Sequence, residues 1–214
     1  MQRLAFNIVE SHFTNNSPEQ QPLHLIIIGL AGAGKSYLIN AIQNLLREKC
    51  QVSATTGKAS YNVSGVTIHS LLKLPVGSKG CKDLTGQALC TLQDLNGIDY
   101  ILIDEYSMLG QATFGWIDKC CKQATGGHDK ILGGKSMILI GDTGQLPPVA
   151  DKPLYHSKPS IYVGEQGYQA YSMFDKVVKL TVNQRVQGTC PEQVQFRELL
   201  SRLCIGKSTF QDWR

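Results

Sequence analysis

The sequence lacks the features that would place the protein in several common classes. Its purely apolar runs, such as residues 25–28, are far shorter than the ~20 residues that a membrane-spanning helix needs. Its seven cysteines form no C-x-x-C pair and no cluster with metal-ligand spacing, and their odd number argues against a disulfide framework. Repeats, low-complexity tracts and interdomain linkers are also missing. These absences predict one intracellular domain with reduced thiols and no membrane partner.

Charge gives little guidance on a binding partner. The 214 residues include 21 Lys and Arg and 17 Asp and Glu, which leaves a formal net charge of +4. That balance falls short of the basic excess that indicates nucleic acid without other evidence. With 42% hydrophobic residues, the chain has the composition of an ordinary globular protein and is long enough for one sizeable domain.

One segment has the pattern of a phosphate-binding loop. Residues 29–36 (GLAGAGKS) follow the apolar run 25–28 and precede a helix-patterned stretch at 37–42. Glycines let backbone N–H groups wrap closely around a β-phosphate, Lys35 would reach the β- and γ-oxygens, and the Ser36 hydroxyl would ligate Mg²⁺. A glycine-rich turn that contains Lys-Ser by chance is the alternative, and the strand–loop–helix context counts against it. The predicted nucleotide-binding residues are Gly29, Gly32, Ala33, Gly34, Lys35, Ser36 and Tyr37.

An acidic pair ends another apolar strand. Asp104 and Glu105 follow residues 101–103 directly. Asp104 is predicted to lie beside Mg²⁺ through its water shell, and Glu105 to polarise the water that attacks the γ-phosphate. A kinase must keep water away from that phosphate, so a water-activating carboxylate indicates hydrolysis. The alternative is a solvated acidic pair at a strand end.

A glutamine follows a third apolar strand. Residues 138–142 end in Gly-Asp, and Gln145 comes three residues later. Its amide both donates and accepts hydrogen bonds, so it could contact the γ-phosphate or the attacking water. Pro147 and Pro148 would then direct the backbone away from the site. Taken alone, this segment is a turn followed by a stiff loop.

Strand and helix patterns alternate along the chain, which predicts an α/β fold with a central, mostly parallel sheet flanked by helices. The expected strands are 25–28, 51–55, 99–103, 135–140 and 177–180. The expected helices are 37–42, 87–95, 111–123 and 191–204. One or two further short helices are expected within 56–72, with a break near Gly65, and a loop is expected at 75–86. Between 141 and 168 the chain is rich in Pro, Gly and Tyr, which predicts a long ordered excursion or a small hairpin.

Together these motifs resemble the superfamily I DNA helicases of the Pif (petite integration frequency) type, which are related to RecD and to the helicase halves of Helitron transposons. GLAGAGKS resembles motif I, ATTGKASYNVSGVTIHS motifs Ia and Ib, LIDEYSML motif II, GDTGQLPPV motif III and LTVNQRV motif IV. The match extends over nearly the whole chain. The stretches DEYSMLGQ and GEQGYQ look like the Helitron-associated branch.

The resemblance implies a RecA-like P-loop NTPase with ATP and Mg²⁺ as ligands. The roles it implies are catalytic for Lys35, Glu105, Gln145 and Arg185, metal binding for Ser36 and Asp104, adenine recognition for Gln2, and contact with single-stranded DNA for Thr55, Thr56 and His69. For His69 the alternative is a satisfied polar residue near a helix start. For Arg185 the alternative is an ordinary salt bridge.

At the level of the whole chain, the resemblance implies the ATP-hydrolysing, N-terminal RecA-like lobe of a 5′-to-3′ DNA helicase, at residues 1–214. The second lobe is expected to be absent from this chain, so we expect nucleotide binding, weak binding of single-stranded DNA and no unwinding by these residues alone. We also expect a DNA-associated protein in the nucleus or another intracellular compartment, with roles in DNA repair, recombination or telomere maintenance. An inert lobe with a structural nucleotide site and a small P-loop kinase remain as alternatives, although an Arg-rich lid for a kinase acceptor is not visible.

Overall fold

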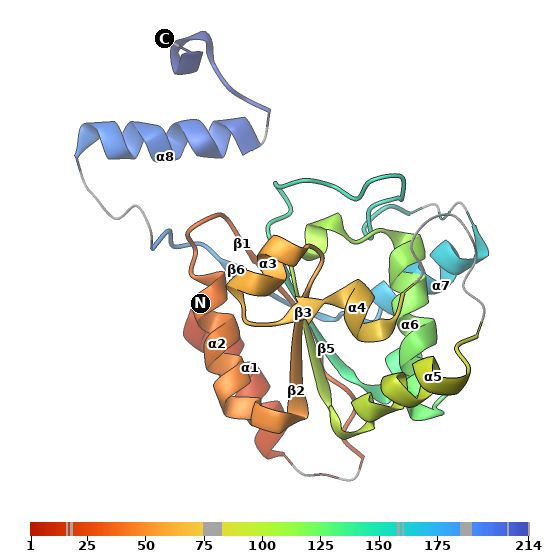
Figure 1. Ribbon diagram of the computed structural model, residues 1–214. Coiled ribbons are helices and arrows are strands. Elements are labelled where there is room, and N and C mark those ends of the chain that lie inside the picture. The colour runs from red at the N-terminus through yellow and green to blue at the C-terminus, as the bar shows by residue number, and fades with distance from the viewer. Residues whose placement is uncertain are drawn as a thin grey trace.

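A six-stranded parallel sheet forms the centre of the computed structural model, which describes residues 1–15, 17, 19–74, 83–157, 159, 161–184, 190–204 and 206–213. The strands are β1 His24–Gly29, β2 Cys50–Ala54, β3 Val66–Thr67, β4 Tyr100–Asp104, β5 Ser136–Gly141 and β6 Lys176–Leu180. Their order across the sheet is β3-β2-β4-β5-β1-β6, and every pair is parallel. All the strands therefore end at the same edge of the sheet (Figure 1).

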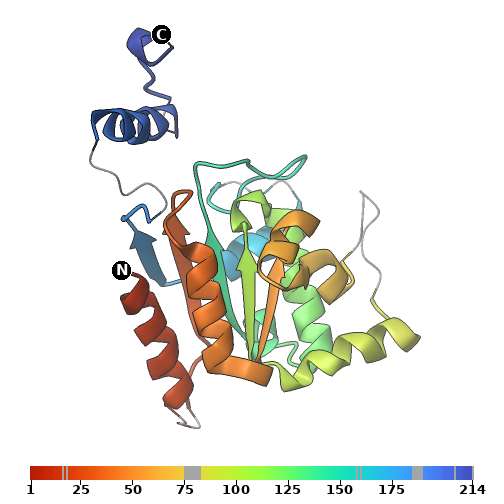
Figure 2. The same ribbon diagram turned by 60° about the vertical axis from the view of Figure 1, so that its left-hand side comes forward.

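Helices cover both faces of this sheet. They are α1 Gln2–Thr14, α2 Lys35–Leu46, α3 Gly57–Asn62, α4 Ile68–Leu72, α5 Gly86–Gln93, α6 Gln111–Thr125, α7 Tyr162–Tyr171 and α8 Pro191–Cys204. Short 3₁₀ turns lie at Arg47–Lys49, Asp94–Gly97, Tyr106–Met108, Ile131–Gly134 and Phe210–Trp213. Helices α1 and α2 pack on one face and α5, α6 and α7 on the other, whereas α8 lies away from the sheet (Figures 1 and 2). None of the described helices has both the length and the apolar character that a membrane crossing requires.

Side chains of β4 point alternately to the two faces of the sheet, and each face has its own hydrophobic cluster. Tyr100 and Leu102 pack with α1 and α2, whereas Ile101 and Ile103 pack with α6. Successive side chains of a strand point to opposite faces, so a strand covered on both faces buries every residue, as β4 does. This explains why residues 100–103 of the strand are all apolar or aromatic.

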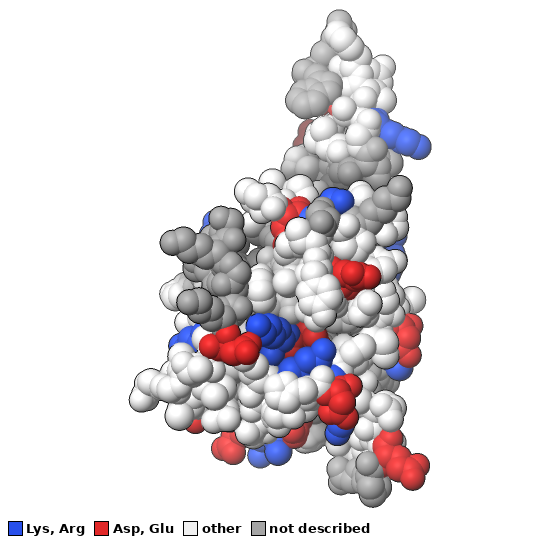
Figure 3. Space-filling view, turned by 90° about the vertical axis from the view of Figure 1, so that its right-hand side faces the viewer, with Lys and Arg blue, Asp and Glu red and all other residues white. Residues whose placement is uncertain are grey.

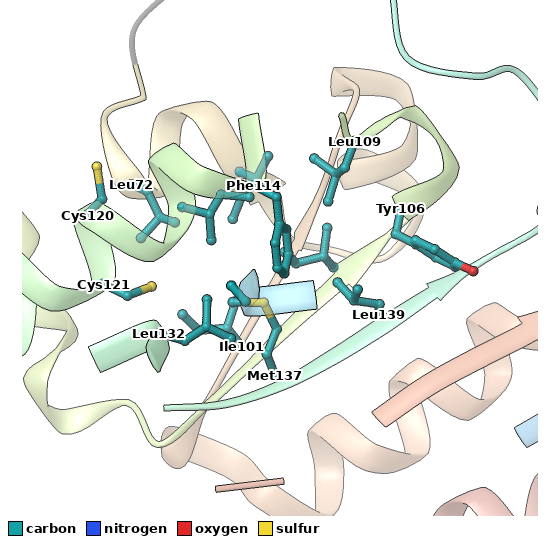
Figure 4. Packing of buried hydrophobic residues seen from close by; sticks show 14 of the residues in the cluster. Leu72, Ile101, Tyr106, Leu109, Phe114, Cys120, Cys121, Leu132, Met137 and Leu139 are labelled. Atoms are coloured by element: carbon teal, nitrogen blue, oxygen red, sulfur yellow. The ribbon is translucent and has the colours of Figure 1, made fainter. Parts of the chain in front are cut away.

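The larger cluster centres on Phe114 of α6, which is fully buried. Its ring points among Ile101, Met137 and Leu139 of the sheet (Figure 4). On the side of α7, the Phe114 ring lies 6.0 Å from the ring of Phe174. Helix α6 is thereby fixed against the strands that carry the acidic pair and the glutamine.

Helices α6 and α7 approach closely because of two glycines. A Cβ atom on Gly167 would lie 1.9 Å from the Gln111 carbonyl oxygen, and one on Gly115 would lie 2.0 Å from the Val163 carbonyl oxygen. Real Cβ atoms do not approach other atoms so closely. The small side chains are therefore a packing requirement of this helix pair.

The structure confirms the predicted α/β class, and the five predicted strands agree with β1, β2, β4, β5 and β6 to within a few residues. The segment 56–72 contains α3 and α4, with Gly65 in the break and the short β3 beside it. The expectation for residues 141–168 was wrong in part, because its end belongs to α7 and the described part contains no hairpin strands. Helix α1 was not predicted. Residues 75–82 of the predicted loop lie outside the described residues.

Candidate nucleotide-binding site

A pocket of about 550 Å³ lies at the carboxyl ends of the strands. Its lining comes from the loop after β1, the end of β4, the segment after β5, helix α3 and the segment after β6. The lining residues are Ala31, Gly32, Gly34, Lys35, Ser36, Tyr37, Ala59, Asn62, Asp104, Glu105, Gln145 and Gln184. Three sequence motifs that are far apart along the chain thus converge on one pocket, as expected at the carboxyl edge of a parallel sheet.

The loop between β1 and α2 depends on its glycines. Gly32 and Gly34 have φ values of 81° and 82°, in the left-handed region that side chains rarely adopt. A Cβ atom on Gly34 would also lie 2.1 Å from Nε2 of Gln2, and one on Gly29 would lie 3.0 Å from Cβ of Ala33. The glycines predicted to let the backbone approach a phosphate are therefore required by this loop conformation.

Lys35 begins α2 and folds back over the loop. Its Nζ donates hydrogen bonds to the carbonyl oxygens of Gly29 at 2.7 Å and Leu30 at 3.3 Å. The twelve-residue helix α2 starts at this point, so its unpaired N–H groups and positive dipole end face the same pocket. An anion is suited to this site, because it would meet the Lys35 ammonium group, the backbone N–H groups and the positive end of the α2 dipole.

The acidic pair lies beside this cation. Asp104 is 6% exposed, and its Oδ1 accepts a hydrogen bond from the Glu105 backbone N–H at 2.9 Å. Burial raises the pKa of Asp104, an effect that the Glu105 N–H and Lys35 oppose. Burial also raises the pKa of the half-buried Glu105, and the negative charge of Asp104 raises it further. The pocket therefore raises the proton affinity of both carboxyl groups, and the positive charge of Lys35 offsets part of this effect.

The donor set fits Mg²⁺. The Ser36 hydroxyl and the Asp104 carboxylate line the same pocket, and Mg²⁺ takes oxygen ligands. No group of three or more His, Cys, Asp or Glu side chains that could hold a metal by itself exists among the described residues. A Mg²⁺ ion at this place would depend on water and on substrate phosphates for its other ligands, which is its usual mode of binding at nucleotide sites.

Gln145 is held at the pocket by the preceding turn. Its backbone N–H donates to the Asp142 carbonyl oxygen at 3.1 Å, and its Nε2 donates to Asp142 Oδ2 at 3.4 Å. The other carboxylate oxygen of Asp142 accepts from the Gly144 N–H at 3.0 Å. The turn after β5 thus directs the glutamine side chain toward the pocket that contains Lys35 and Glu105.

Gln2 contacts the loop from outside the pocket. It is half-buried at the start of α1, and its Nε2 donates to the Ala33 carbonyl oxygen at 2.9 Å. The predicted adenine-binding residue therefore lies against the phosphate-binding loop, although it is not among the residues that line the pocket.

Sequence reasoning missed four lining residues. Ala31 belongs to the phosphate-binding loop, next to the predicted Gly32. Ala59 and Asn62 come from α3, and Gln184 comes from the segment after β6. The Gln184 backbone N–H donates to the Gly32 carbonyl oxygen at 2.7 Å. The sequence does carry a signal for Gln184, because this residue directly precedes Arg185 in LTVNQRV, the segment that resembles motif IV. Arg185 itself lies outside the described residues.

Two of the three predicted DNA-binding residues, Thr55 and Thr56, lie in the turn between β2 and α3, and the third, His69, lies on α4. Thr55 follows β2, and its Oγ1 donates to the Glu105 carbonyl oxygen at 3.1 Å. Thr56 is the N-cap of α3, where its Oγ1 accepts from the Ala59 N–H at 3.2 Å. His69 is half-buried on α4. The structure therefore brings Thr55 next to the acidic pair.

The surface charge is mixed. On the face shown in Figure 3, Lys and Arg side chains are interspersed with Asp and Glu side chains. Among the ion pairs of the described residues, one joins Lys119 Nζ to Asp83 Oδ1 at 2.8 Å. This mixture of charges on the surface agrees with the net charge of +4.

A second and larger cavity, of about 680 Å³, lies at the amino ends of the strands. Its lining includes His12, Lys49, Asp99, Tyr100 and Lys135. None of the residues predicted to act in nucleotide chemistry or DNA binding is among them. The two cavities can therefore be tested separately by substitution.

Comparison with known proteins gives the family. The family model described as PIF1-like helicase matches residues 2–213. The chain is 28% identical over 191 residues to the ATP-dependent DNA helicase PIF1 of Saccharomyces cerevisiae, an alignment that covers 86% of this chain and 21% of that protein. The structure is similar to that of Bacteroides Pif1 bound to single-stranded DNA, with a TM-score of 0.71 and 22% identity over 99% of this chain and 47% of that one. It is also similar to Bacteroides Pif1 in complex with ADP-AlF4, with a TM-score of 0.67 and 23% identity over the same shares. The chain thus spans about a fifth of its yeast relative and about half of the matched structures.

Proposed function

Because the chain belongs to the PIF1-like helicase family, we propose that it is the ATP-binding and ATP-hydrolysing lobe of a DNA helicase that moves 5′-to-3′ on single-stranded DNA. The observation that carries this proposal is the convergence of Lys35, Ser36, Asp104, Glu105 and Gln145 on one pocket. Two matched Bacteroides structures, one bound to single-stranded DNA and one to ADP-AlF4, support the choice of ligands.

Each side chain has a chemical role in this proposal. Lys35 and the N–H groups of the loop would hold the phosphates, and Ser36 and Asp104 would hold Mg²⁺, which when bound neutralises phosphate charge. Glu105 would accept the proton of the attacking water. Burial raises the pKa of Glu105, which makes its carboxylate a stronger base. Gln145 would orient that water.

Further parts of the proposal come from the resemblance of the motifs. Arg185 would stabilise charge on the γ-phosphate, and Gln2 would read the adenine. Thr55, Thr56 and His69 would contact single-stranded DNA. A second RecA-like lobe in the full-length protein would complete the motor. We place the protein with DNA in the nucleus or another intracellular compartment, in repair, recombination or telomere maintenance.

Two alternatives predict different behaviour. An inert lobe with a structural nucleotide site would bind ATP without turning it over, and the arrangement of Glu105 and Gln145 beside Lys35 disfavours it. A small kinase would transfer the phosphoryl group to an acceptor such as a nucleoside monophosphate. The carboxylate at the pocket disfavours the kinase, because a water-activating group would waste ATP.

Hydrolysis by purified residues 1–214 tests the proposal. We expect slow ATP turnover that exceeds the background of Lys35→Ala, and we expect Glu105→Gln to bind ATP but to hydrolyse it at the background rate. Equal rates for the wild-type chain and Lys35→Ala would contradict the proposal, and transfer to a nucleoside monophosphate would favour the kinase. We also expect weak binding of a single-stranded oligonucleotide and no strand separation, so robust unwinding by these residues alone would refute the assignment to a single lobe.

A further inference from the structure

Glu105 has an unusual backbone conformation that three hydrogen bonds hold in place. Its φ and ψ are 55° and 41°, in the left-handed region. For a residue with a side chain this conformation is strained, and it persists where the surrounding structure holds it. The Glu105 N–H donates to Asp104 Oδ1, and its carbonyl oxygen accepts from the Met108 N–H at 3.2 Å and from Thr55 Oγ1 at 3.1 Å. The direction of the Glu105 side chain depends on these bonds.

Thr55 supplies the one bond of the three that comes from another segment of the chain. Strands β2 and β4 pair in register up to Ala54 and Asp104, and the Thr55 N–H continues the ladder to the Asp104 carbonyl oxygen at 3.3 Å. The Thr55 hydroxyl then reaches one residue further, to Glu105. It therefore fixes the backbone of the proposed base from the neighbouring strand.

We propose that Thr55 is a positioning residue for Glu105, so that the turn between β2 and α3 controls the direction of the carboxylate that activates water. This inference rests on the proposed function. The same turn caps α3 through Thr56, and α3 carries Asn62 into the pocket. A displacement of residues 55–56 would move Glu105 and one wall of the pocket together. Because Thr55 also belongs to the proposed DNA path, a strand that engages this turn acts on hydrolysis through one hydrogen bond.

Ser53 offers a matched control on the same strand pair. Its Oγ donates to the Leu102 carbonyl oxygen at 2.9 Å, so it makes the same kind of bond from β2 to β4. Ser53 is fully buried, but its bond is made to Leu102, which does not line the pocket. Its loss should lower stability without affecting hydrolysis, and this separates a structural hydroxyl from a positioning one.

The experiment measures kcat and KM for ATP with residues 1–214 in the absence of DNA. Thr55→Val removes the donor and keeps the shape; we expect kcat to fall about 10- to 100-fold, since small misplacements of a reacting group have effects of that size. We expect its KM to stay within about 2-fold, because ground-state binding is unchanged. Thr55→Ser keeps the donor and should restore kcat to near the wild-type value, and Ser53→Ala should leave kcat unchanged.

The outcomes distinguish this inference from the proposed function. A wild-type kcat in Thr55→Val, in a chain that hydrolyses ATP faster than Lys35→Ala, would overturn the inference and leave the function standing. A kcat for Ser53→Ala as low as that of Thr55→Val would overturn it as well, since general loosening of the strand pair would then be the cause. Wild-type turnover no faster than that of Lys35→Ala would contradict both. If Thr55→Val does not fold, as judged by circular dichroism, Thr55→Ala and Thr55→Ser make the same comparison.

Discussion

Asp142 and Gln145 are joined by two hydrogen bonds, one between their backbones at 3.1 Å and one between their side chains at 3.4 Å. Asp142 is 4% exposed, and its second carboxylate oxygen is held by the Gly144 N–H. The glutamine that we place beside the attacking water is therefore oriented by a buried carboxylate.

Asp142→Asn should lower hydrolysis while preserving nucleotide binding. The new amide can keep the bond from Gly144, but it would turn an N–H toward Gln145 Nε2, so that two donors face each other. We expect kcat to fall about 10-fold and ATP affinity to stay within about 2-fold. Because the two residues act as a unit, Asp142→Asn combined with Gln145→Ala should be no slower than Gln145→Ala alone. Additive losses in this double-mutant cycle would show that Asp142 acts independently.

Gly34→Ala should disable the phosphate-binding loop. An alanine there would have to adopt φ near 82° and would place Cβ 2.1 Å from Gln2 Nε2. We expect at least about a 10-fold loss of ATP affinity, because a left-handed alanine costs roughly 1–2 kcal/mol before any clash. Adding Gln2→Ala should recover only part of the loss, since it removes the clash and leaves the backbone strain. Gly57→Ala is the control, because a Cβ there has no atom within 4 Å; a similar loss in that variant would contradict the explanation.

Gly167→Ala should destabilise the fold without touching the nucleotide pocket. The added Cβ would meet the Gln111 carbonyl oxygen at 1.9 Å and force α7 away from α6. Overpacking of this kind costs about 1–3 kcal/mol, which urea unfolding can measure. Gly97→Ala, whose Cβ would meet nothing within 4 Å, should change the free energy of unfolding by about 0.5 kcal/mol or less. Equal unfolding midpoints for the two variants would show that the helices can separate freely.

Stability should rise with pH through the titration of His24. Burial lowers the pKa of His24 below 6.5, and its ring lies 5.3 Å from the ring of Phe174. The unfolded chain therefore binds more protons than the folded one as the pH falls below 6.5, and the free energy of unfolding decreases over that range. His24→Phe removes the titrating group and should reduce this slope in urea titrations at pH 5 to 7. A slope unchanged by the substitution would assign the pH dependence to other groups.

The strands could be predicted because their apolar runs are local and unbroken. Residues 101–103 and 138–140 are buried on both faces, which requires side chains that the sequence displays directly. Helix α7 could not be predicted in the same way. Gly164 and Gly167 lower helix propensity and favour a loop. The contact that makes Gly167 necessary is with Gln111 of α6, which lies far earlier in the chain. Helix α1 buries Ala5 and Val9 completely.

In the site, too, residues within one local motif could be predicted, whereas contacts between distant segments could not. Lys35 and Ser36 could be placed because the phosphate-binding loop is one continuous segment, and Glu105 because parallel strands end at one edge. The contact of Gln184 with Gly32 requires that β6 lie next to β1. No local sequence pattern predicts the order of strands in a sheet, so this contact could not be predicted. The bond from Thr55 to Glu105 likewise depends on the register between β2 and β4.

We expect Mg²⁺-ATP to bind in the pocket at the carboxyl ends of the strands. Calorimetric titration of Mg²⁺-ATP into the wild-type chain, Lys35→Ala and Lys49→Ala tests it directly, because Lys35 lines this pocket and Lys49 lines the larger cavity at the opposite end. We predict one site in the wild-type chain and in Lys49→Ala, and a loss of affinity of at least about 10-fold in Lys35→Ala at an unchanged unfolding midpoint. Wild-type affinity in Lys35→Ala, with the loss in Lys49→Ala instead, would contradict this assignment and place the nucleotide site in the larger cavity.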